Sequence, residues 1–124
     1  MNYWLQLISL EAHQAGADGL FNDDDEAILQ LNGETIWEGT MESGDIIPFD
    51  ETLSSIPFSD VASLTLYDED SGIFGIEEIG GDDDFLGSHT ITPNGSLPFT
   101  EAVNFSEGGS QYTLVYAVTP VFAL

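Results

Sequence analysis

The sequence predicts an all-β sandwich, and three observations carry that prediction. Short runs of aromatic and branched residues alternate with polar residues, as in strands that bury one face. Clusters of Gly, Pro, Asn and Asp separate these runs, and no long stretch shows the period of a helix. We therefore expect a single antiparallel β-sandwich of about seven or eight strands, formed by one domain that spans residues 1–124.

The clearest local signal is the pair Asn32-Gly33, which separates two apolar runs at 28–31 and 34–37. Both residues tolerate the positive φ that a type I′ turn requires, so the pair predicts a β-hairpin. Residues 11–24, where acidic residues accumulate, are predicted as the loop before it.

The other elements follow from shorter patterns. Residues 56–58 are expected at an edge or in a connector, because Pro57 cannot donate to a strand ladder. The pattern of residues 97–105 does not assign them to one type of secondary structure. Trp4, Trp37, Tyr112 and Tyr116 are assigned to the core. The remaining strands are expected at 3–10, near 46–47, and at 61–67, 85–92 and 111–118.

The charge balance limits the partners. The chain has 23 Asp and Glu residues, no Lys or Arg, and a formal net charge of −23. Nucleic-acid binding needs cationic side chains and is excluded, and docking to anionic membranes is not expected. A basic protein partner or a multivalent cation remains. The hydrophobic fraction of 42% is sufficient for a packed core.

The absence of Cys excludes disulfides, zinc–thiolate sites and cysteine nucleophiles. The first residues show neither a basic signal-peptide region nor an apolar run long enough to span a membrane. We therefore expect a cytoplasmic protein. His13 and His89 are expected as ordinary strand or loop residues.

Residues 64–87 concentrate the acidic side chains. A strand-like run ends in Asp68-Glu69-Asp70, a Gly-containing loop follows, and Asp82-Asp83-Asp84 precedes the next apolar run. Two like charges about 4 Å apart repel by roughly 4 kcal/mol at an effective dielectric constant of about 20. The carboxylates therefore point apart into water, stay protonated, or hold a cation between them. Oxygen ligands in a flexible loop favour Ca²⁺.

These residues resemble the third calcium-binding loop of C2 domains, in which two alternate Asp residues end one strand and a further Asp precedes an aromatic-aliphatic-Gly start of the next. The resemblance implies Asp68, Asp70 and Asp84 as calcium ligands. It also implies a first loop in which Asp25 stands before a strand, with Asp18 upstream, or Asp23 or Asp24 in its place. The gap between Asp70 and Asp84 is longer than in the resembling loops, so Glu77, Glu78 and Asp82 are candidates to add to these ligands or to replace them. Asp83 is a further candidate.

Size and acidity also resemble the small acidic calcium-binding proteins of cyanobacteria. An EF-hand is rejected, because Ile73 and Ile79 occupy the positions that require Gly and Glu. No hydrolase motif is present, and an enzyme is not expected. The prediction is a calcium buffer or sensor. The alternative is an acidic domain adapted to high salt without a specific metal site.

Overall fold

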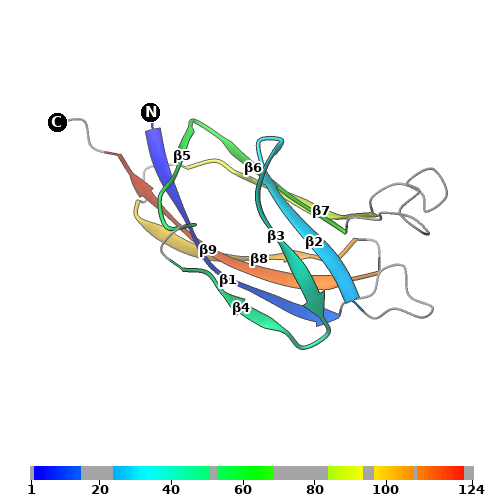
Figure 1. Ribbon diagram of the computed structural model, residues 1–124. Coiled ribbons are helices and arrows are strands. Elements are labelled where there is room, and N and C mark those ends of the chain that lie inside the picture. Colours follow the sequence, from blue (N-terminus) through cyan, green and yellow to red (C-terminus); the bar gives the residue numbers. More distant parts are fainter. Residues whose placement is uncertain are drawn as a thin grey trace.

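The protein is a two-layer β-sandwich. The computed structural model describes residues 2–14, 24–50, 53–68, 84–93, 97–107 and 109–121. In these residues one five-stranded and one four-stranded antiparallel sheet pack face to face (Figure 1). The prediction of an all-β sandwich is confirmed, with nine strands in the described ranges in place of the expected seven or eight.

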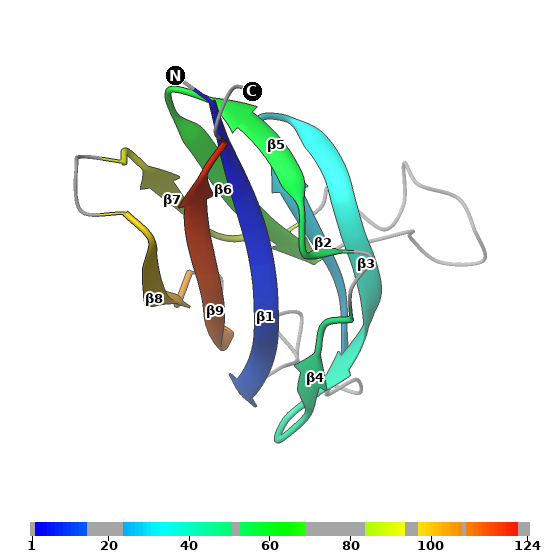
Figure 2. The same ribbon diagram turned by 90° about the vertical axis from the view of Figure 1, so that its left-hand side faces the viewer.

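The five-stranded sheet is built around β1 (Asn2–Gln14). One edge of β1 pairs with β9 (Gln111–Pro120), which in turn pairs with β8 (Phe99–Phe105). Its other edge pairs with β5 (Ile56–Ser59) and, further along, with β4 (Ile46–Pro48). Figure 2 shows β1 between β9 and these two short strands. β5 is therefore an edge strand, as Pro57 predicts.

The four-stranded sheet has the order β3 (Glu34–Glu42), β2 (Asp24–Leu31), β6 (Ala62–Asp68) and β7 (Asp84–Ile91). Asn32 and Gly33 form the turn between β2 and β3 with φ values of 50° and 87°. The predicted hairpin is confirmed, and both turn residues have the positive φ of a type I′ turn.

The core lies between the sheets and follows the alternation of each strand. In β9 the predicted inward residues Tyr112, Leu114, Tyr116 and Val118 are all buried. In β6 the inward residues are Ala62, Leu64 and Leu66, and the intervening side chains face outward. Within the described part of the chain, no helix is long and apolar enough to cross a membrane.

Two predictions about the first strand were wrong. Residues 11–14 continue β1, because its far end pairs with the start of β9 and the Ala12 N–H donates to the Asp45 carbonyl at 2.8 Å. Trp4 is 36% exposed, because Tyr3 and Leu5 take the inward positions on either side of it. Trp37 is partly buried and packs against the core.

Candidate metal centre

Three strand ends meet at one end of the four-stranded sheet (Figure 1). β2 begins at Asp24, β6 ends at Asp68 and β7 begins at Asp84. In the ladder, Asp68 lies opposite Ala27 on one side and opposite Asp84 on the other. Neighbouring strands are about 4.8 Å apart, so the backbones at 68 and 84 are immediate neighbours. Asp25 lies two residues before Ala27 on β2.

Asp68 occupies an inward position at the end of β6. It continues the buried series of Leu64 and Leu66, and only 2% of its surface is exposed. Its Oδ1 accepts a hydrogen bond of 2.8 Å from the Glu26 N–H, which ties the end of β6 to the start of β2. A carboxylate offers about four acceptor positions, so it can accept this bond and ligate a cation at the same time.

The predicted ligands divide into three groups. Asp68 is described in full. Asp24, Asp25 and Asp84 are placed by backbone register at the same end of the sheet. The rest lie outside the described residues: Asp18, Asp70, Asp82 and Asp83, together with Asp23, Glu77 and Glu78. Among the side chains that are described, no group of three His, Asp or Glu residues is arranged to hold a metal ion.

Sequence reasoning missed two carboxylates at this end. Glu42, the last residue of β3, lies opposite Asp24, and the following turn carries Asp45. Asp45 Oδ2 accepts the Glu42 N–H at 2.8 Å. The sequence did contain a signal for the position of Glu42, because the Asn32-Gly33 turn fixes which residues of β2 and β3 face each other. A register shift between Leu29 and Gln30 moves the pairing by one residue.

The Gly in the Phe85-Leu86-Gly87 segment has a packing role. Gly87 has a φ of +145°, and a Cβ there would lie 2.8 Å from Phe105 Cδ1 and 3.1 Å from Phe105 Cα. The adjacent Leu86 is buried, and its carbonyl accepts the Glu107 N–H at 3.0 Å. β7 and β8 therefore join the two sheets directly beside the candidate centre.

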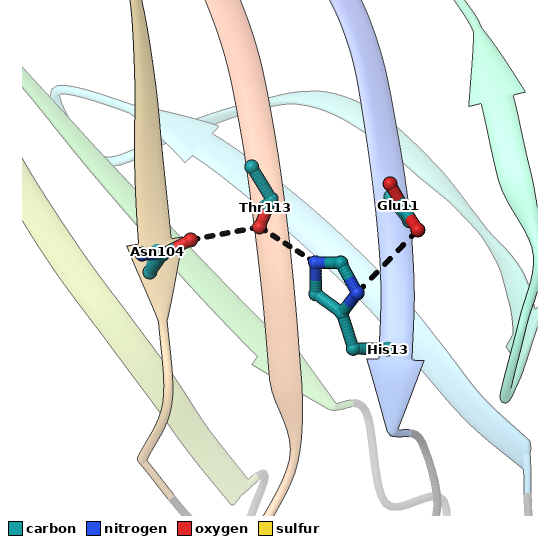
Figure 3. Close-up of polar contacts among 4 residues, drawn as sticks. All are labelled: Glu11, His13, Asn104 and Thr113. Carbon is teal, nitrogen blue, oxygen red and sulfur yellow. Dashed lines mark hydrogen bonds and ion pairs between the residues drawn. The ribbon is translucent and has the colours of Figure 1, made fainter.

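His13 belongs to a hydrogen-bonded chain on the outer face of the five-stranded sheet (Figure 3). Its Nε2 lies 2.8 Å from Thr113 Oγ1, and Thr113 donates to Asn104 Oδ1 at 2.7 Å. Its Nδ1 lies 3.4 Å from Glu11 Oε2. The interactions cross three neighbouring strands, which gives His13 a structural role.

His89 lies in a second polar chain, between the two sheets. Its Nε2 lies 3.0 Å from the Tyr116 hydroxyl, which donates to Glu101 Oε2 at 2.8 Å. Tyr116 is fully buried. Burial raises the pKa of Tyr116 above its ordinary value, and the hydrogen bond to Glu101 and the charge of that carboxylate raise it further.

We expect Tyr116→Phe to lower the free energy of unfolding by about 1–2 kcal/mol, because the bridge from His89 to Glu101 is lost. The raised pKa gives this loss a pH dependence. The unfolded chain releases the phenol proton from about pH 10 upward, while the folded state retains it, so the contribution of Tyr116 is complete below pH 10 and declines above it. Urea unfolding at several pH values should show the free energies of unfolding of the parent and of Tyr116→Phe converging at alkaline pH.

The outward-facing Tyr67→Phe is the control, and its free energy of unfolding should change by no more than about 0.5 kcal/mol. If the difference between the parent and Tyr116→Phe widens above pH 10, the assignment is contradicted.

The comparisons with known proteins support the fold. No protein-family model matches the chain, and no curated protein matches it. Among solved structures it is similar to that of Drosophila C2-DSL-EGF1, with a TM-score of 0.51 and 9% sequence identity. The match covers 95% of this chain and 66% of that chain, so the protein spans just under two thirds of the length of its neighbour. The likeness shows a C2-like β-sandwich.

Proposed function

We propose that the protein binds calcium at the end of the sandwich where β2 begins, β6 ends and β7 begins. The observation that carries the proposal is the strand register. Asp68 and Asp84 occupy opposite positions in one ladder, and the acidic start of β2 lies beside them. A sequence separation of sixteen positions is thereby reduced to one strand spacing, about 4.8 Å.

The chemistry of the donors favours calcium over other metals. The chain has no Cys and only two His, so nearly all ligands that it can offer are oxygens. It also has no Lys or Arg that could neutralise neighbouring carboxylates. A bound divalent cation would supply this compensation. Both the C2-like fold and the resemblance of residues 64–87 to a calcium-binding loop support the same conclusion.

Within this proposal the protein acts as a cytoplasmic calcium buffer or sensor without enzymatic activity. A buffer needs only affinity and capacity, whereas a sensor needs a surface that changes when the ion binds. A sensor role would involve a basic protein partner, since the chain carries no side-chain cation other than a protonated His.

A second candidate function is that of an acidic domain adapted to high salt. It is favoured by exposed carboxylates far from the candidate centre. Glu34, beside the hairpin turn, and Asp60, just before β6, lie at the opposite end of the four-stranded sheet. In this case the negative charge would keep the protein soluble, and no site would select calcium.

A calorimetric calcium titration on chelator-stripped protein distinguishes the two functions. We expect calcium-selective binding that Asp68→Asn/Asp84→Asn weakens by at least about a hundredfold, since each lost carboxylate ligand removes a direct charge–ion interaction. The matched control is Glu34→Gln/Asp60→Asn, which removes the same charge at the opposite end and should change the affinity by less than about threefold. Equal weakening in both variants, or equal heat with magnesium, would leave only the salt-adapted function.

A further inference from the structure

The outer face of the four-stranded sheet carries a row of apolar side chains. Ile28 on β2, Tyr67 on β6 and Phe85 on β7 occupy successive opposite positions in the ladder. The Tyr67 and Phe85 rings contact edge to face at a centroid distance of 5.9 Å, and Phe85 is 44% exposed. No other layer of the described residues covers this face (Figure 1). We call these three residues, one aliphatic and two aromatic, the aromatic row.

A shallow acidic pocket of ≈ 250 Å³ adjoins the aromatic row, between β2 and β3. Glu26 and Glu38 line it together with Ile28 and Thr40. Glu38 on β3 lies directly opposite Ile28, so it stands at the end of the aromatic row, in line with its three residues. Glu26 lies opposite Thr40. The two glutamates occupy diagonal positions about 7–8 Å apart, and both are exposed. One cationic group can therefore approach both carboxylates.

We propose that the acidic pocket and the aromatic row together bind a basic segment of another protein, with an Arg or Lys side chain between Glu26 and Glu38 and a neighbouring apolar residue on the aromatic row. Charge complementarity selects this partner. The aromatic rings add a cation–π surface for the stem and head of an Arg, and packing area for its neighbour. The surface lies on the outer face of the sheet and adjoins the candidate calcium centre, because Tyr67 and Phe85 form the ladder pair next to Asp68 and Asp84. The test is therefore made in chelator.

Other occupants fit less well. A second copy of this chain has no Lys or Arg and would bring more negative charge to the same face. Anionic lipid and nucleic acid are repelled for the same reason. A small inorganic cation would use the two glutamates but gain nothing from the aromatic row. A peptide that carries both cationic and apolar side chains uses the whole surface.

Nuclear magnetic resonance titration tests this proposal. ¹⁵N-labelled protein in chelator and at low ionic strength is titrated with the blocked peptide acetyl-Gly-Arg-Trp-Arg-Gly-amide, and with the same peptide carrying Gln in place of Arg. We expect the Arg peptide to shift the amide signals of β2, β3 and the Tyr67–Phe85 pair. The Gln peptide should shift them much less, because it retains the apolar contact and lacks the charge.

Three variants complete the test. Glu26→Gln/Glu38→Gln should raise the dissociation constant of the Arg peptide at least about fivefold, and Phe85→Ser at least about twofold. Glu34→Gln/Glu107→Gln removes the same charge from exposed positions elsewhere and should change it by less than about 1.5-fold. Equal weakening by the two double variants, an unchanged affinity in Phe85→Ser, or no shift with the Arg peptide would each overturn the proposal.

Discussion

Replacing Gly87 by alanine is expected to lower the free energy of unfolding by about 4 kcal/mol. Two costs add. A φ of +145° is unfavourable for a residue with a Cβ, at about 1–3 kcal/mol. The new Cβ would also lie 2.8–3.1 Å from three atoms of Phe105, one of them its Cα, and such overpacking costs about 1–3 kcal/mol more. Urea denaturation measures the change.

Gly44→Ala separates these two costs. Gly44 has a φ of +93°, but an added Cβ would meet no atom within 4 Å. Its replacement should therefore show the conformational cost alone, about 1–2 kcal/mol. If Gly87→Ala costs no more than Gly44→Ala, the close approach of β7 to Phe105 is not under strain and Gly87 does not hold the two sheets together as described.

Asp68→Asn is expected to have effects of opposite sign with and without calcium. In chelator the variant should be more stable than the parent by about 1 kcal/mol, because it removes one of several neighbouring negative charges at this end of the sheet. Asn keeps an Oδ1 that can accept the Glu26 N–H, so the variant removes the charge and retains this hydrogen bond. With free calcium at 100 times the dissociation constant, the parent gains about 2.7 kcal/mol and the order of stability reverses.

Thermal unfolding of both proteins in chelator and in calcium measures this reversal, with Asp60→Asn as the control. Asp60 has a φ of 64°, a conformation that Asn tolerates well, and it lies at the other end of β6. Its effect should have the same sign in both conditions. If Asp68→Asn also keeps one sign, Asp68 acts as a hydrogen-bond acceptor for β2 and does not bind calcium.

The fold was predictable where local chemistry determines it. Asn32-Gly33 specifies its own turn, and the alternation of Tyr112, Leu114, Tyr116 and Val118 specifies the inward face of β9. The errors arose where distant segments decide. The extension of β1 to Gln14 depends on its pairing with β9 and β4, which lie far along the chain. Trp4 is apolar, but the inward alternation of its neighbours places it outside.

The candidate centre was predictable in part for the same reason. The acids that end β6 and begin β7 are visible in the sequence, because a strand pattern stops and resumes around them. The sequence does not show that Asp68 and Asp84 lie opposite each other. Their register depends on the pairing of Tyr67 with Phe85 and on the register shift between Leu66 and Tyr67. Glu42 and Asp45 could have been found approximately by counting from the Asn32-Gly33 turn, but the register shift between Leu29 and Gln30 offsets that count by one residue.

The central position of β1 has a consequence for the order of folding. β1 pairs with β9 over most of its length, and the Val121 N–H donates to the Asn2 carbonyl at 3.1 Å. The five-stranded sheet therefore cannot close during synthesis until β9 has left the ribosome, although the hairpin of β2 and β3 can form much earlier. Contacts of such long sequence separation slow folding. Until then the edge of β1 that pairs with β9 is exposed, and the dense negative charge of the nascent chain, by repelling other copies, protects this apolar strand from association.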